Sequence, residues 1–270
     1  MSVNFNESLK QEYQHLFDTC RIRPTRAAAV LGLVNKIVSN RSRYEAVGGP
    51  LGVPWHFVGI IHNMEASLNF KTHLHNGDPL TARTVHVPAG RPKQGNPPFT
   101  WEDSAADALS LENLGSPAGW SIPATLFKME RYNGFGYRLR HPDVLSPYLW
   151  SFTEHYTSGK FISDGTFSRT AVSAQCGGAA LLRRMAELNI VTFDQHNEPL
   201  PANTPGGVDA LGPLVQFSNT KRSDLAMELQ KALNKFPGIF VKEDGVPGDK
   251  TSEAFKRVTG HFLAGDPRGA

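Results

Sequence analysis

The stretch that decides the fold of this chain covers residues 52–70 and reads GVPWHFVGIIHNMEASLNF. Its apolar residues recur at helical spacing, which predicts a helix that is buried along most of its length. Glu65 lies on this apolar stripe, in register with Val58, Ile61 and Leu68. A carboxyl among apolar neighbours is partly desolvated, which raises its pKa and suits a general acid. The alternative is a structural glutamate that bonds a backbone amide or an arginine.

Composition allows one large domain, or one domain with a small module, in these 270 residues. The net charge is +3 and the basic residues are scattered, so no nucleic-acid stripe or polybasic membrane anchor is indicated. A mildly basic chain does suit an anionic polymer. Cys20 and Cys176 are too few and too far apart for a zinc knuckle or a disulfide scaffold. We expect two buried thiols, with a single disulfide as the alternative.

The first residues lack the basic and then apolar pattern of an export signal, and no run approaches the ~18 apolar residues of a membrane span. We therefore expect a chain without a signal peptide or membrane span that is synthesised in the cytoplasm. We also expect it to be a monomer.

The fold class predicted from periodicity and turn signals is mainly α, of the α+β kind. Helical patterns start near Ser8, Thr25, Pro54, Thr100 and Ser121 and recur later in the chain. Asn-Gly at 76–77 separates two short extended runs, so we expect a small β-hairpin over about 70–88. The expected domains are a helical catalytic domain over 1–194, a Pro- and Gly-rich linker over 195–213, and a small three-helix module over 214–270.

Asp78 lies at the tip of that expected hairpin, shortly after Glu65. Sugar hydrolysis commonly uses two carboxyl groups about 5 to 9.5 Å apart, one as the acid and one to activate water or stabilise the cation. Asp78 is therefore our candidate for the second carboxyl, with Glu102 and Asp103 as weaker candidates. Asn-Gly-Asp-Pro is also ordinary turn chemistry, so a structural role for Asp78 stays open.

Aromatic residues gather in two Gly- and Pro-containing segments at 130–138 and 147–153. Flat rings with polar edges are surfaces on which pyranose rings stack. Packing in the core is the alternative for each ring. The candidates for sugar contact are Trp101, Tyr132, Tyr137, Tyr148 and Trp150.

The motifs around these residues resemble a known superfamily. Residues 53–70 resemble the helix of soluble lytic transglycosylases and goose-type lysozymes, in which a catalytic Glu is followed by Ser; here Ala66 stands between Glu65 and Ser67. Residues 132–136 (Tyr-Asn-Gly-Phe-Gly) resemble the Tyr-Asn-small-Gly turn of that superfamily, and residues 147–150 (Pro-Tyr-Leu-Trp) resemble its downstream aromatic segment. The motifs cover about 50–155, and residues 78–84 stand where the superfamily has Gly-Leu-Met-Gln.

The resemblance implies a lysozyme-like domain that cleaves the β-1,4 bond between N-acetylmuramic acid and N-acetylglucosamine in peptidoglycan, with Glu65 as general acid. It implies no cofactor and no metal. It leaves open whether water or the sugar's own hydroxyl completes the reaction, and Asp78 is similar in placement to the helper Asp of goose-type members. The implied substrate-binding residues are Ser67, Tyr132, Asn133, Tyr137, Tyr148 and Trp150.

The C-terminal segment resembles the type 1 peptidoglycan-binding module, which has a Leu-Gln helix and an Asp-Gly-x-x-Gly-x-x-Thr turn. Here Leu229-Gln230 supplies the first, and the turn runs from Asp244 through Gly245 and Gly248 to Thr251. The implied partner is the glycan of the bacterial wall. A helical hairpin that closes the fold is the alternative.

Two other function classes stay open at this point. One is a metal-dependent wall peptidase or amidase, for which His62, His73, His75 and His86 are the candidate ligands, although no His-Glu-x-x-His signature is present. The other is a non-catalytic glycan-binding protein, and a chitin-directed activity is also open. The missing export signal favours a phage endolysin or an effector with its own export machine.

Overall fold

The computed structural model describes residues 3–112, 114, 119–163, 165–193 and 208–269. The chain divides into two compact units. The first unit contains Met1–Gln14 and Cys20–Met185, and the second contains His15–Thr19 and Ala186–Ala270.

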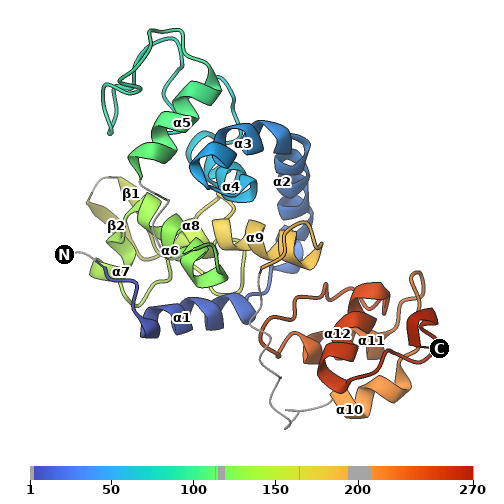
Figure 1. Ribbon diagram of the computed structural model, residues 1–270. Helices are drawn as coiled ribbons and strands as arrows, with labels where there is room; N and C mark the ends of the chain where they lie inside the picture. The colour runs from blue at the N-terminus through green and yellow to red at the C-terminus, as the bar shows by residue number, and fades with distance from the viewer. Residues whose placement is uncertain (1–2, 113, 115–118, 164, 194–207, 270) are drawn as a thin grey trace. The chain divides into compact units, whose positions relative to one another are not determined.

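The first unit is built mainly from helices (Figure 1). In chain order the elements that lie wholly or mostly in it are α1 (Glu7–Asp18), η1 (Pro24–Arg26), α2 (Ala27–Ser39), α3 (Arg41–Gly48), η2 (Gly49–Leu51), α4 (Trp55–Ala66), α5 (Trp101–Leu111), α6 (Ile122–Asn133), α7 (Gly136–Arg140), α8 (Pro147–Trp150), β1 (Lys160–Ser163), β2 (Thr166–Ser168) and α9 (Gly178–Glu187).

The helix predicted at 54–69 is α4, and every residue from 57 to 64 is buried. It packs against α2 and α3, which lie beside it in Figure 1. The buried residues of α2 are Val30, Val34 and Ile37, which recur every three or four positions and so present one apolar stripe. Burial on nearly all sides explains why most residues of α4 are apolar.

Side-chain caps begin several of the predicted helices. Asn6 accepts a hydrogen bond of 2.9 Å from the Leu9 amide at the start of α1. Thr100 accepts one of 3.1 Å from the Asp103 amide at the start of α5. These bonds satisfy amide groups that have no partner inside the helix, which is why such residues mark helix starts in the sequence.

The predicted fold class is confirmed, since the part of the chain that the structure describes is mainly α with a small antiparallel hairpin, but the hairpin lies elsewhere in the chain. β1 pairs with β2, with Phe161 opposite Phe167, and an irregular register follows Phe161. The signal for this hairpin was the Asp-Gly dipeptide at 164–165, a favoured hairpin turn.

The segment where the hairpin was expected forms a single antiparallel bridge between Thr72 and Pro79. Two features stop a longer ladder. Pro79 has no amide hydrogen to donate. The side chain of Asp78 also accepts the backbone amide of Val85, which draws the following chain into a loop instead of a second strand.

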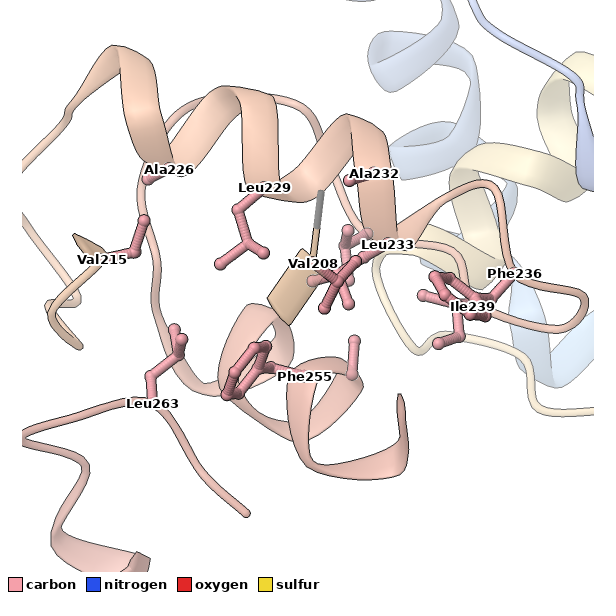
Figure 2. Packing of buried hydrophobic residues seen from close by; sticks show 12 residues of the cluster. Val208, Val215, Ala226, Leu229, Ala232, Leu233, Phe236, Ile239, Phe255 and Leu263 are labelled. Carbon is pink, nitrogen blue, oxygen red and sulfur yellow. The ribbon is translucent and has the colours of Figure 1, made fainter. Parts of the chain in front are cut away.

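The second unit has its own apolar core, shown in Figure 2. Its helices are α10 (Val208–Leu211), α11 (Asp224–Leu233) and α12 (Asp249–Thr259), with short 3-10 turns η3 (Gly212–Leu214) and η4 (Pro267–Gly269). The core consists of Val208, Val215, Ala226, Leu229, Ala232, Leu233, Phe236, Ile239, Val241, Ala254, Phe255 and Leu263.

Most of the predicted linker, 195–213, lies outside the described residues. From Val208 onward that segment is helical, and Val208 is fully buried in the core of the second unit. The predicted linker therefore overlaps the folded unit, and its last Gly and Pro residues belong to the turn η3.

Candidate active site

Glu65 lies in the last turn of α4, one residue before the helix ends at Ala66. Ser67 then adopts a left-handed conformation, with φ of 50°. Because the helix ends here, Glu65 keeps partial exposure while the residues before it are buried. The main chain thus holds one carboxyl at the boundary between the core and the surface.

The environment of Glu65 raises its pKa to about 7. Burial is the main cause, the negative charge of Glu112 adds to it, and a hydrogen bond from Tyr148 opposes both. The carbonyl-rich end of α4 acts in the same direction as burial, because negative charge is disfavoured at a helix C-terminus. Near neutral pH the carboxyl is therefore protonated in a large fraction of molecules.

Tyr148 fixes one oxygen of this carboxyl. Its hydroxyl donates a hydrogen bond of 2.7 Å to Oε1 of Glu65, and its side chain is buried. No hydrogen bond or ion pair to Oε2 of Glu65 is recorded within the described residues. The carboxyl is thus oriented through one oxygen, and the other is left to carry a transferable proton.

The helix that carries Tyr148, α8, lies close to the start of α9. A Cβ atom on Gly177 would lie 2.3 Å from the carbonyl oxygen of Leu149, so only glycine fits at this crossing. Two residues earlier, the side-chain amide of Gln175 donates a hydrogen bond of 2.6 Å to the carbonyl oxygen of Met64. Gln175 therefore satisfies a carbonyl in the last turn of α4, beside Glu65.

A tight turn at 73–78 lies against the same helix end. Gly77 has φ of +80°, and a Cβ atom there would lie 3.0 Å from the carbonyl oxygen of Glu65. The hydroxyl of Tyr132, from the end of α6, donates a hydrogen bond of 3.3 Å to the carbonyl oxygen of Leu74 in this turn. Four segments therefore meet around Glu65: the turn, α4, α6 and α8.

Asp78 is held within its own loop. Its Oδ2 accepts hydrogen bonds from the backbone amides of Val85 (2.8 Å) and His86 (3.0 Å), and its Oδ1 lies 2.6 Å from Nδ1 of His86. Burial raises the pKa of Asp78, but these hydrogen bonds outweigh it and lower the pKa to about 2. Both oxygens of the carboxylate are thus used to fix the loop that follows the turn.

Glu112 is a carboxyl whose charge acts on Glu65 and that the sequence analysis did not single out. It caps the C-terminal end of α5 and is partly exposed. Burial raises its pKa, and the positive charge of Arg131 opposes the rise. One signal was available in the sequence, because an acidic residue at the C-terminal end of a helix opposes the helix dipole and is out of place there.

The remaining candidate sugar-binding residues divide by exposure. Ser67 and Asn133 are exposed at the ends of α4 and α6. Tyr137 is buried under the hairpin, where its hydroxyl accepts a hydrogen bond of 3.1 Å from the Phe161 amide. The ring of Trp150 is 1% exposed and that of Trp101 is 2% exposed, so neither offers a face to a sugar.

The histidines considered as metal ligands each contact different partners. His73 lies between Ser104 Oγ and the carbonyl oxygen of Ala82, and His75 pairs with Asp107 at 2.8 Å. His62 lies 3.0 Å from the hydroxyl of Tyr44. Among the described residues, no group of three His, Cys, Asp or Glu side chains is placed to hold a metal ion. Cys20 and Cys176 are both buried as thiols.

A polar pocket of about 190 Å³ lies elsewhere in the first unit. Its lining includes Asp143, His155, Tyr156 and Arg169, and none of the residues around Glu65 belongs to it. The ion pair between Asp143 and Arg169 at its edge is exposed, so it closes a surface hollow rather than a buried site.

In the second unit, Gln230 holds the turn that resembles a wall-binding module. Its side-chain amide donates to Asp244 Oδ1, to the carbonyl oxygen of Val246 and to Thr251 Oγ1 at 3.0 to 3.1 Å, and its carbonyl oxygen accepts from the Gly245 amide at 2.7 Å. The motif residues of this turn therefore bond mainly to one another, and they shape the turn.

Comparisons of the chain with protein-family models, curated proteins and solved structures return no match. Within the described residues, every helix is too short or too polar to cross a membrane. The chemistry of the site is therefore inferred from its own geometry.

Proposed function

We propose that this protein is a peptidoglycan-degrading glycosidase of the lysozyme-like superfamily. In this proposal it cleaves the β-1,4 bond between N-acetylmuramic acid and N-acetylglucosamine, and Glu65 is the general acid. The observation that carries the proposal is one partly exposed carboxyl that combines a pKa of about 7 with an Oε1 that is fixed by Tyr148.

The chemistry follows from that carboxyl. Glycosidic oxygens are very weak bases, so the bond to the anomeric carbon breaks readily only when an acid delivers a proton to the leaving oxygen. A pKa near the working pH keeps the acid protonated and still able to give the proton up. With Oε1 held by Tyr148, Oε2 is the oxygen that would deliver the proton.

The sugar contacts in this proposal are the exposed or partly exposed candidates. Ser67, Tyr132 and Asn133 lie at the helix ends that surround Glu65. Tyr148 contributes its hydroxyl to Glu65 rather than a ring face to the sugar. Tyr137 and Trp150 are left to packing, because their rings are buried.

The proposal includes wall binding by the second unit. Its support is the sequence resemblance of the 229–254 segment to a peptidoglycan-binding module and the Gln230 network, which gives that segment a defined turn. Holding the enzyme on an insoluble polymer raises the local substrate concentration for the first unit.

The test is digestion of purified peptidoglycan by the full chain, followed by mass spectrometry of the released fragments. The comparison is among the wild type, Glu65→Gln and Glu154→Gln, which replaces an exposed glutamate outside the site. We expect muramic ends from the wild type and Glu154→Gln, and at least a 100-fold loss in Glu65→Gln, in line with the ~10²–10⁴ of a general acid.

Other outcomes select another function. Cleaved peptide stems that disappear when a chelator is added would indicate a metal-dependent peptidase or amidase. Wall binding without any released fragment, equal in the wild type and Glu65→Gln, would indicate a binding protein. Equal release of fragments from chitin would indicate a chitin-directed activity.

A further inference from the structure

Gln175 is an exposed residue beside the end of α4 that carries Glu65. Its side-chain Nε2 donates a hydrogen bond of 2.6 Å to the carbonyl oxygen of Met64, the residue before Glu65. Bond lengths across the peptide that joins Met64 to Glu65 place this Nε2 within about 6 Å of the Cα atom of Glu65. The two carboxyls that flank a scissile glycosidic bond lie about 5 to 9.5 Å apart, so groups at such separations can contact one sugar.

The segment that carries Gln175 leads into α9, which packs against both α4 and α8 (Figure 1). At the first residue of α9, a Cβ atom on Gly178 would lie 3.3 Å from the side chain of Ile60 on α4. It would lie 3.7 Å from the carbonyl oxygen of Tyr148 on α8. The crossing of these elements therefore brings Gln175 and Tyr148 to the same end of α4, where Glu65 lies.

The main chain around Gln175 is held in place before and after it. The Gln175 amide donates a hydrogen bond of 3.3 Å to Oγ of Ser173, and the Ser173 amide donates one of 3.1 Å to the hydroxyl of the buried Tyr156. The next residue, Cys176, is buried. Such support positions a side chain before a ligand arrives.

The carboxamide of Gln175 has an acceptor to spare. A carbonyl oxygen only accepts hydrogen bonds, so the NH2 group of Gln175 faces Met64 and its Oε1 faces elsewhere. No hydrogen bond to this Oε1 is recorded within the described residues. Fixing a glutamine side chain costs rotamer entropy, and an exposed one gains little from burial in return. An exposed amide that is nevertheless oriented suits a ligand that brings an N–H donor.

We propose that Gln175 contacts the 2-acetamido group of the sugar that binds at Glu65, and that its Oε1 accepts the acetamido N–H. This inference rests on the proposed glycosidase function and names the part of the substrate that the site reads. N-acetylmuramic acid and N-acetylglucosamine both carry this group at C2, where glucose carries a hydroxyl.

The geometry of the acetamido group explains the preference. Its N–H has a fixed direction because the amide is planar, and its nitrogen donates without accepting. A hydroxyl hydrogen rotates and bonds water equally well. An acceptor that is already held in place, as Oε1 of Gln175 is, therefore favours the acetamido sugar over glucose in the same β-1,4 linkage.

The experiment measures binding to the full chain with Glu65→Gln, so that no sugar is cleaved. Calorimetry compares the β-1,4 tetramers of N-acetylglucosamine and of glucose, in this background with and without Gln175→Ala. We expect Gln175→Ala to weaken binding of the acetamido tetramer about 10-fold, in line with one hydrogen bond, and to change binding of the glucose tetramer by less than about 2-fold. Equal changes for the two sugars, or no change for either, would overturn the assignment.

Two control variants and a direct probe accompany these measurements. Gln175→Met keeps the length of the side chain and should behave as Gln175→Ala, whereas Gln11→Ala replaces an exposed glutamine of α1 and should leave both affinities unchanged. In an NMR titration, the side-chain amide resonances of Gln175 should move with the acetamido tetramer and stay in place with the glucose tetramer. The reverse response would contradict the contact.

Kinetics separate a substrate contact from a purely structural role. In the chain with Glu65 intact, Gln175→Ala should raise KM for soluble peptidoglycan fragments about 10-fold and leave the pH profile of kcat in place. If the variant instead moves the alkaline limb of that profile and keeps the wild-type sugar preference, Gln175 positions Glu65 through α4 and the proposed contact is wrong.

Failure of this inference and failure of the proposed function give different results. If the wild type releases glycan fragments and Gln175→Ala keeps the sugar preference, the inference alone is refuted. If the wild type releases no fragment while the Gln175 resonances respond to the acetamido tetramer, the glycosidase alone is refuted. No release and no response would refute both.

Discussion

The hydroxyl of Tyr148 donates a hydrogen bond of 2.7 Å to Oε1 of Glu65, and so joins α8 to the last turn of α4. The two residues are 83 positions apart in the sequence. This contact orients the carboxyl and lowers its pKa, while burial and the charge of Glu112 raise it. The balance among these three effects sets the pH at which the site can donate a proton.

Tyr148→Phe removes that hydrogen bond and keeps the ring. Because the bond favours the ionised carboxylate, its loss should raise the pKa of Glu65 further above about 7. The direct measurement is a carbon NMR titration of the Glu65 carboxyl in both proteins. A pKa that falls in Tyr148→Phe would contradict the contact. In an activity assay, the alkaline limb should move to higher pH and kcat should fall about 10-fold.

Stability should depend on pH through Glu65. Its pKa is about 7 in the folded protein, against an ordinary value of 4.5. Between these values the folded state holds a proton that the unfolded state has released, so the stability contributed by Glu65 is complete below pH 4.5 and is lost as pH rises through 7. The gap corresponds to about 3 kcal/mol.

Tryptophan fluorescence offers a clean measurement, because all four tryptophans of the chain, Trp55, Trp101, Trp120 and Trp150, lie in the first unit. Urea unfolding from pH 4 to pH 8 should show the wild type losing about 3 kcal/mol more than Glu65→Gln, which cannot titrate. If the free energy of unfolding changes with pH in the same way in both proteins, Glu65 has an ordinary pKa.

Asp78→Ala should loosen the loop after the turn. The substitution removes the acceptor of the Val85 and His86 amides, and hydrogen bonds to a charged group contribute about 1.5 to 3 kcal/mol each. Amide hydrogen exchange at these two residues should speed up at least 10-fold. The matched control is His86→Ala, which keeps both backbone bonds and should leave the Val85 amide protected.

Gln230→Ala should open the turn of the second unit. Gln230 is 1% exposed and makes four hydrogen bonds to the turn, so its loss leaves buried polar groups without partners and should cost about 2 to 4 kcal/mol. Exchange of the Gly245 amide reports this directly. Lys231→Ala is the control. It replaces the next residue of α11, which pairs with Glu228 at the surface, and should change stability by less than about 0.5 kcal/mol. Faster exchange in both variants alike would point to general instability of the unit.

Much of the fold was predictable because its signals are local. Helix caps such as Thr100 and the apolar spacing of α4 depend on residues a few positions apart, so the main helices and the fold class were predicted and confirmed. The hairpin was misplaced because an Asn-Gly turn and an Asp-Gly turn give equal local signals. What decided between them was whether the flanking residues could continue a ladder, and Pro79 could not.

The sequence by itself determined that a glutamate would lie on the apolar stripe of a buried helix, because helical spacing alone puts Glu65 in register with Val58 and Ile61. Only the tertiary structure decided what surrounds that carboxyl. Tyr148 bonds it from a remote segment and the charge of Glu112 acts on it from another, while Asp78 turns into its own loop and Trp150 turns into the core. Desolvation and charge depend on distances in space, which contacts between remote segments fix and local patterns do not.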